Sequence, residues 1–154
     1  MIPRRRAVAV LAMAAVTAGC AANPSPGGGG GPIRSVRAFA AQLSGAEVVP
    51  PVGGGGSGTA AVTLYPGGKW MTWEVDYVGL SGPATAAHFH GPAAAGANAG
   101  VAVGLGPNLD SPIVGSAEVT DAQAADLVAG RWYVNIHTAA NPNGELRGQV
   151  TPVH

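Results

Sequence analysis

The clearest pattern in the sequence is the alternation of apolar and polar residues from Lys69 to Val78. One side of this segment carries the large apolar residues Met71, Trp73, Val75 and Tyr77. The other side carries the polar residues Thr72, Glu74 and Asp76. A period of two residues is typical of a strand that buries one face, so we predict a strand over 69–78.

Shorter runs of the same kind predict seven more strands, at 36–43, 59–64, 84–90, 101–105, 113–119, 132–138 and 146–151. The turn Tyr65-Pro66-Gly67-Gly68 predicts a hairpin between the second and third strands. Short strands at this spacing predict an all-β fold, an antiparallel Ig-like β-sandwich of seven or eight strands. We expect its core to contain Trp73, Tyr77, Trp132 and Val134.

One short helix is predicted between Thr120 and Ala129. Thr120 is a good N-cap, and Gln123 stands three residues later, which is the spacing of a capping box. Asp121 places a negative charge at the positive end of the helix, and Gly130 is positioned to end it. We assign no chemistry to this helix.

The N-terminus follows the pattern of a secretory signal peptide. Three arginines, Arg4 to Arg6, precede the uncharged run 7–18. We therefore predict a signal peptide over residues 1–19. Ala18-Gly19-Cys20 resembles a bacterial lipobox, in which the cysteine thiol carries lipid, although Thr17 stands where such motifs usually have leucine. The alternative is a plain signal peptide cut near Ala22, which leaves a soluble protein.

The next segment is rich in glycine and proline. We expect residues 20–32 to form a lipidated start and a flexible linker, because this composition cannot bury apolar surface. The folded domain is then expected at 33–154. Together these features predict an extracytoplasmic protein of the cell envelope, anchored to the membrane by lipid on Cys20.

Charge narrows the range of partners. The 154 residues include 8 Lys plus Arg and 8 Asp plus Glu, and the predicted signal peptide contains three of the basic residues. So few basic residues argue against a nucleic-acid partner and leave lipid as the means of membrane contact. The single cysteine, Cys20, excludes a disulfide framework and a cysteine-ligated zinc module.

Histidines are the candidate residues for chemistry. His88 and His90 are one residue apart on a predicted strand, so their side chains share a face. His137 shares a face with Tyr133 and Asn135 on the predicted strand 132–138. If these strands are neighbours, three imidazoles converge and suit copper or zinc, with one coordination position left open. Alternatively, His88 and His90 only bond to loop backbone.

A second cluster of polar residues follows the predicted turn Asn141-Pro142-Asn143-Gly144. Glu145, Arg147 and Gln149 alternate there with Leu146, Gly148 and Val150. We interpret Arg147 as a solvated or salt-bridged strand residue. The functional alternative is that Arg147 attracts an anion beside the histidines.

Several motifs, taken in order, resemble the CHRD domain, the module first described in chordin. They are residues 39–51, Tyr77-Val78-Gly79-Leu80, Ala87-His88-Phe89-His90-Gly91-Pro92-Ala93, residues 129–138 and residues 141–150. The resemblance spans Val36 to Val150 and implies an extracytoplasmic β-rich domain without an established reaction. Our first hypothesis is therefore a non-catalytic binding module of the envelope, with a metal site at His88, His90 and His137. The sequence does not identify its envelope partner.

A weaker similarity is to the copper/zinc superoxide dismutases. These enzymes also place a His-x-His pair on one strand of a β-sandwich, a third copper-ligating histidine on a later strand and an arginine beyond it. His88, His90, His137 and Arg147 match this order. No histidine or aspartate cluster follows His90 to bind zinc, and a disulfide is impossible with Cys20 alone. The alternative function is therefore a copper-only, superoxide dismutase-like redox enzyme with Arg147 as a catalytic residue.

Overall fold

The structure is a computed structural model that describes residues 32–154. The predicted signal peptide, Cys20 and the linker before Pro32 lie outside the described residues. Within residues 32–154, no helix is long and apolar enough to cross a membrane.

The structure has eight antiparallel strands, as the sequence pattern predicts, and all eight belong to a single sheet. They are β1 (Arg37–Ser44), β2 (Ser57–Leu64), β3 (Trp70–Val78), β4 (Ala84–His90), β5 (Val101–Gly104), β6 (Ile113–Glu118), β7 (Trp132–Thr138) and β8 (Leu146–Pro152). Each strand begins and ends within two residues of its predicted range. Their order across the sheet is β5-β4-β7-β8-β1-β2-β3-β6.

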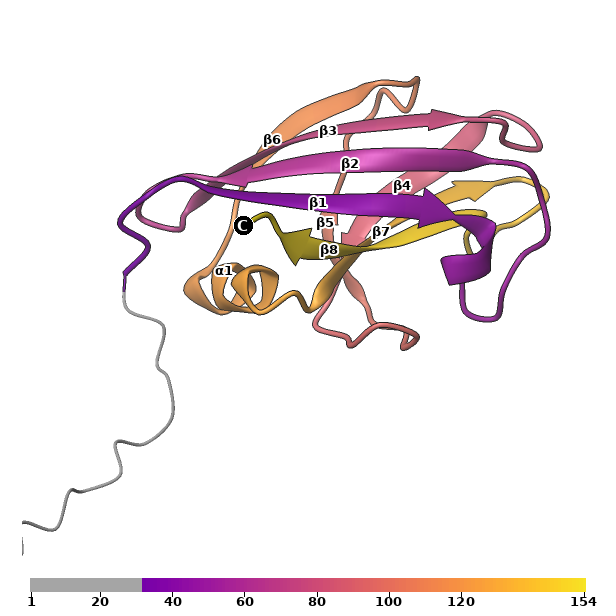
Figure 1. Cartoon of the computed structure of the whole chain (residues 1–154). Helices are drawn as coiled ribbons and strands as arrows, with labels where there is room; N and C mark the ends of the chain where they lie inside the picture. The colour runs from indigo at the N-terminus through magenta and orange to yellow at the C-terminus, as the bar shows by residue number, and fades with distance from the viewer. Residues whose placement is uncertain (1–31) are drawn as a thin grey trace, which may run out of the picture.

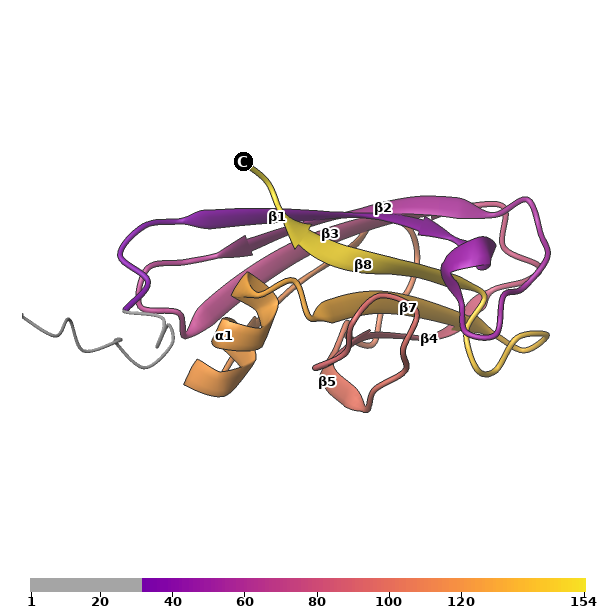
Figure 2. The same cartoon turned by 60° about the horizontal axis from the view of Figure 1, so that its bottom comes forward.

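The sheet folds over on itself into two layers. β1, β2, β3 and β6 form one layer, and β4, β5, β7 and β8 form the other (Figures 1 and 2). The pairing of β8 with β1 joins the layers, whereas β5 and β6 are the two ends of the strand order. The fold is therefore nearly all β and close to a barrel, which confirms the predicted fold class.

The core lies between the two layers. Trp73, Trp132 and Val134 are at most 5% exposed, so three of the four expected core residues are confirmed. Tyr77 is only partly buried and packs against the edge of this core. The ring of Phe89 contacts the edge of Trp73, with ring centres 5.5 Å apart. Aromatic packing of this kind ties β4 in one layer to β3 in the other.

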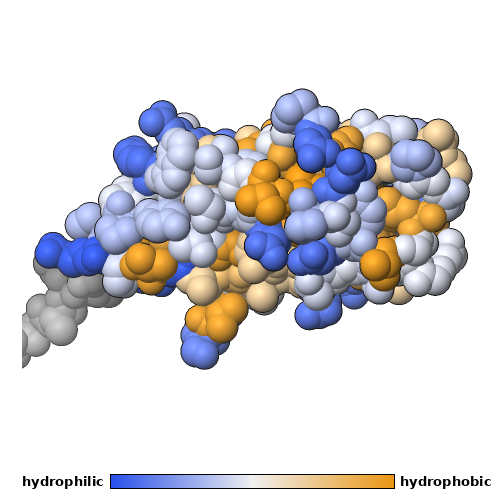
Figure 3. Space-filling view, turned by 90° about the horizontal axis from the view of Figure 1, so that it is seen from above, coloured by the Kyte–Doolittle hydropathy of each residue, from blue (hydrophilic) through white to orange (hydrophobic). Residues whose placement is uncertain are grey.

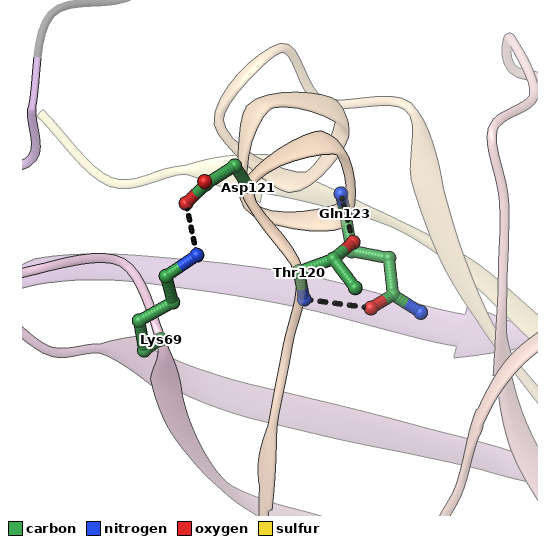
Figure 4. A network of polar contacts seen from close by, with 4 residues as sticks. All are labelled: Lys69, Thr120, Asp121 and Gln123. Atoms are coloured by element: carbon green, nitrogen blue, oxygen red, sulfur yellow. Dashed lines mark hydrogen bonds and ion pairs between the residues drawn. The ribbon is translucent and has the colours of Figure 1, made fainter.

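The predicted helix is present as α1 (Asp121–Val128). The Thr120 hydroxyl accepts a hydrogen bond from the backbone N–H of Gln123, and the Gln123 side chain accepts one from the backbone N–H of Thr120 (Figure 4). Lys69 Nζ also lies 2.5 Å from Asp121 Oδ1, although this ion pair is exposed and contributes little. Leu127 is fully buried, so α1 covers one end of the layers (Figure 2).

The outer faces of the two layers differ. In Figure 3, the β1-β2-β3-β6 layer shows polar and apolar residues intermixed, and Trp70, Val78 and Val114 are exposed there. The outer face of β7 and β8 is covered instead, because Tyr133 is 2% and Arg147 is 1% exposed. Three segments supply contacts on that side: the 3-10 helix η1 (Gly45–Glu47), the loop 91–100 and the turn 139–145. Figure 1 shows the loop 91–100 beneath β7.

Candidate metal site

His88 and His90 point out of the barrel because their neighbours point into it. Ala87 and Phe89 are 3% and 0% exposed and belong to the core, so alternation along β4 sends both histidines to the outer face. His90 is itself 8% exposed, since loops cover this end of the strand. The prediction that both side chains share a face is confirmed.

His137 lies beside His88 and His90, although it comes from the neighbouring strand β7. β7 pairs with β4 in a register that sets His137 opposite Ala86, two residues beyond Asn135, which is the partner of His88. Ile136 is fully buried in the core, so His137 faces outward with the pair on β4. The three side chains therefore converge across two adjacent strands, as the sequence predicted.

The ligand nitrogens are spaced closely enough to share one ion. One nitrogen from each of the three rings lies within 4.8 Å of the others. His88 Nδ1 and His137 Nε2 are 3.3 Å apart. Two imidazole nitrogens at about 2.0–2.1 Å from a tetrahedral metal ion are separated by roughly 3.3–3.4 Å. This pair therefore already has the separation that a tetrahedral ion requires.

Backbone carbonyls fix the orientation of two rings. His90 Nδ1 lies 3.1 Å from the carbonyl oxygen of Ala99, and His137 Nδ1 lies 3.0 Å from that of Pro142. A carbonyl can only accept, so each Nδ1 carries the proton and each Nε2 has a lone pair. The lone pair of His137 Nε2 faces His88 Nδ1, which lies at hydrogen-bond distance. This arrangement of a ring N–H on a carbonyl is the usual support of a metal-binding histidine. His90 Nε2 is buried without a hydrogen-bond partner within residues 32–154.

Burial keeps the rings neutral, which is the form that binds metal. It lowers the pKa of His88 below its usual value, and the proximity of His137 lowers it further. It also lowers the pKa of His90, although the hydrogen bond to the Ala99 carbonyl opposes this change. Both rings are therefore available as ligands at neutral pH.

A cavity of about 420 Å³ opens beside the histidines. Its lining residues are Val49, Pro50, His90, Asn98, Ala99, Tyr133, Asn135, His137, Pro142 and Asn143. None of these residues is acidic, and Arg147 is not among them. Three protein ligands leave a fourth position on a metal ion, and this cavity gives an exogenous ligand access to it.

The family model for the CHRD domain matches residues 39–150. The chain belongs to the CHRD domain family. The match begins in β1 and ends in β8, so the three histidines and the covered outer face all lie within the CHRD domain. No curated protein matched the chain. No solved structure matched it either.

Arg147 of the CHRD domain is not solvated and forms no salt bridge within the described part of the chain, so our interpretation from the sequence was wrong. It is 1% exposed, and its guanidinium donates to the carbonyl oxygens of Glu47 and Ala97 and to the side-chain oxygen of Gln149. Its Cζ lies 4.0 Å from the centre of the Tyr133 ring. Alternation along β8 predicted its face correctly but could not show that loops cover that face.

Tyr133 and Gln149 were not predicted as part of the site. The Tyr133 ring stacks on His90, with ring centres 4.9 Å apart, and its hydroxyl accepts a hydrogen bond from the backbone N–H of Ala99. The Gln149 amide donates to the carbonyl of Ala93. These side chains bind the backbone of the loop 91–100, which positions the carbonyl that orients His90. Their positions on the outward faces of β7 and β8 were the available signal.

Glu145 was also missed as a buried charge. It is 7% exposed and accepts hydrogen bonds from the backbone and hydroxyl of Ser81, the Thr138 hydroxyl and the Asn141 amide. Burial by itself would raise the pKa of Glu145, but these hydrogen bonds outweigh it and lower the pKa to about 2. Glu145 therefore stays ionised and holds the turn that presents the Pro142 carbonyl to His137.

Proposed function

We propose that this protein is an exported CHRD-domain module of the cell envelope that binds one copper ion through His88, His90 and His137 without catalysing a reaction. The observation that carries the proposal is the geometry of the three rings. Their ligand nitrogens lie within 4.8 Å of one another, and carbonyls hold Nδ1 of His90 and of His137, which directs each Nε2 lone pair to the cluster.

Copper is favoured over zinc by the ligand set. Imidazole suits both metals, but affinity for a given nitrogen site rises to a maximum at copper among the divalent ions. Structural zinc sites usually have four protein ligands, whereas three histidines leave one position to the cavity. Zinc is therefore the second candidate.

Binding rather than dismutation is supported by the position of Arg147. An arginine that attracts an anionic substrate has to face the open position of the metal. Here the guanidinium is occupied by neutral oxygens and stacks on Tyr133, and Arg147 is not among the residues that line the cavity. The superoxide dismutase-like enzyme remains the alternative that the experiment below also tests.

The envelope location is proposed from the N-terminal sequence. A basic start, an uncharged run and Ala18-Gly19-Cys20 support export and lipid attachment at Cys20. The membrane is then reached through lipid, and the low number of basic residues gives no support for a nucleic-acid partner. The envelope partner is left open.

The test is elemental analysis of the mature protein after loading with copper and with zinc. We expect about one copper ion per chain in the wild type and none in the double variant His88→Ala/His90→Ala. His154→Ala is the matched control, because it removes a histidine at the exposed chain end. Equal copper content in the wild type and the double variant contradicts the proposal.

The copper-loaded protein is also assayed for superoxide dismutation. We expect the wild type to show no more activity than the double variant with the same amount of added copper. Dismutation that depends on His88 and His90 would replace the binding module by the redox enzyme.

A further inference from the structure

Arg147 carries a buried positive charge without an ionic partner among residues 32–154. The salt bridges within residues 32–154 are Lys69–Asp121 and Arg131–Asp126, and neither includes Arg147. Its hydrogen-bond acceptors are two backbone carbonyls and one side-chain amide, and its Nε has no partner among the described residues. These contacts solvate the guanidinium, but they do not cancel its charge.

This charge lies close to the histidines. β4 and β8 flank β7 on opposite sides, so His90 and Arg147 approach Tyr133 from opposite strands. The Tyr133 ring centre is 4.9 Å from the centre of the His90 ring and 4.0 Å from Arg147 Cζ. Buried side chains rather than solvent therefore separate the guanidinium from a metal ligand, and salt screens such a charge only weakly.

The site itself offers no negative charge to an ion. All three ligands are imidazoles, and the residues that line the cavity include no acid. Glu145 is the one acidic residue among the buried residues of the described chain, and its carboxylate is engaged by Ser81, Thr138 and Asn141. Its charge opposes that of Arg147, so its effect has to be measured separately.

We propose that the three-histidine site binds Cu(I) in preference to Cu(II) and Zn(II), and that Arg147 sets this preference. The inference rests on the proposed function. The repulsion between a fixed positive charge and an ion is twice as large for a divalent as for a monovalent ion. Partial burial of the three rings acts in the same direction, because reduced contact with water penalises the higher charge more.

The size of the effect follows from Coulomb's law. The distances of 4.9 Å and 4.0 Å to the Tyr133 ring centre put the guanidinium at most about 12 Å from an ion bound to His90. At this separation and an effective dielectric constant of about 20, one unit of charge on the ion changes its affinity roughly tenfold. Removing the charge of Arg147 is therefore expected to lower the ratio of Cu(I) to Cu(II) affinity about tenfold. For a one-electron couple, this equals a fall of about 59 mV in the reduction potential of the bound copper.

The experiment measures both affinities in the full mature protein. Cu(I) is titrated anaerobically against a chromophoric Cu(I) chelator, and Cu(II) and Zn(II) are titrated by calorimetry. We expect the wild type to bind Cu(I) most tightly. Arg147→Met should reduce the Cu(I) to Cu(II) ratio about tenfold, whereas Arg147→Lys should keep it within about threefold of the wild type, because lysine retains the charge.

Glu145→Gln is the second test and needs no change at Arg147. Loss of its negative charge should raise the same ratio, which is the opposite direction from Arg147→Met. This variant keeps the proposal falsifiable if Arg147→Met fails to fold, as judged by circular dichroism.

The results distinguish a failure of the proposed function from a failure of the present inference. If the wild type binds neither copper nor zinc at the histidines, the proposed function fails. If copper binds but Cu(II) or Zn(II) binds more tightly than Cu(I), only the present inference is overturned. It is also overturned if folded Arg147→Met and Glu145→Gln both keep the wild-type ratio.

Discussion

The rings of His90 and Tyr133 stack face to face, with their centres 4.9 Å apart and their planes inclined by 3°. Both side chains also bond to the same backbone residue, since His90 Nδ1 donates to the carbonyl of Ala99 and the Tyr133 hydroxyl accepts from its N–H. The ring and the loop together therefore hold His90 in one orientation.

Replacing this ring should weaken metal binding. We expect Tyr133→Leu to lower copper affinity by about 10-fold or more, which is the usual cost of losing a group that orients a metal ligand. Tyr133→Phe keeps the stacked ring and loses only the hydroxyl contacts, so its loss should be smaller. Calorimetric titration of both variants measures the difference. An affinity of Tyr133→Leu equal to that of the wild type would mean that the stack does not position His90.

Metal binding should be retained to lower pH than at exposed histidines. Burial lowers the pKa of His88 and of His90, so these rings stay neutral as the pH falls through about 6.5, the usual value for histidine. We expect copper affinity to be flat from pH 8 to about 6.5 and to fall only below about pH 6. A dissociation constant that already rises at pH 7 contradicts this expectation.

The same groups affect the stability of the metal-free protein. With a folded pKa below the unfolded value, the unfolded chain binds more protons, so stability falls as the pH drops below about 6.5. Urea denaturation at pH 7.5 and at pH 5.5 measures the change. The double variant His88→Ala/His90→Ala should show less of it than the wild type.

Glu145 should contribute to stability over a different pH range. Its folded pKa of about 2 lies below the usual carboxyl value, so its contribution is present above about pH 4.5 and is lost as the pH falls toward 2. Glu145→Gln is expected to reduce the free energy of unfolding by roughly 1.5–3 kcal/mol at pH 7, as for hydrogen bonds to a charged group. Glu118→Gln, on an exposed position of β6, is the matched control. Equal stabilities of the two variants would refute the structural role of Glu145.

Gly144 should not tolerate a side chain. Its φ is +123°, and a Cβ atom there would overlap the side-chain amide of Asn135. We expect Gly144→Ala to destabilise the fold by about 1–3 kcal/mol, which thermal denaturation measures. Gly104→Ala is the control, because a Cβ at Gly104 has no atom within 4 Å. A melting temperature of Gly144→Ala equal to that of the control would show that the turn adapts freely.

Lipid attachment is tested at Cys20. We expect mass spectrometry of the mature protein to find lipid-modified Cys20 as its first residue, and Cys20→Ser to release the protein from the membrane fraction. The control is Ala22→Ser, a change of similar size two residues away. An unmodified N-terminus at Asn23, with the wild type in the soluble fraction, would rule out the anchor.

The strands and the convergence of the histidines could be predicted because both depend on short-range periodicity. Alternation along 69–78 defines β3, and the His-x-His spacing puts two rings on one face whatever the rest of the fold does. Helix α1 could be predicted for the same reason, because the Thr120–Gln123 capping box is a local motif.

The burial of Arg147 and Glu145 could not be predicted in this way. Their alternation with apolar residues marks a face that points out of the sheet, and such faces are usually solvated. Here η1 and the loop 91–100 cover Arg147 through backbone carbonyls rather than apolar side chains. Glu145 is covered by polar groups of Ser81, Thr138 and Asn141. Alanine and glycine dominate the loop, so no hydrophobic pattern indicates where it packs.

The segments just before and just after β1 make different contacts at the two ends of this strand. At its start, the Ile33 carbonyl accepts from the backbone N–H of Gly67, and at its end the Glu47 carbonyl accepts from Arg147. The strand register sets Ser44, at the end of β1, level with Arg147, Asn135 and His88. The histidines therefore lie toward the end of β1 that is opposite to the incoming chain, and Figure 1 shows the two ends of this strand. In a chain tethered to a membrane through a flexible N-terminal segment, this arrangement would leave the cavity open to the surrounding medium, and the proposed metal would then exchange with dissolved carriers rather than with lipid headgroups.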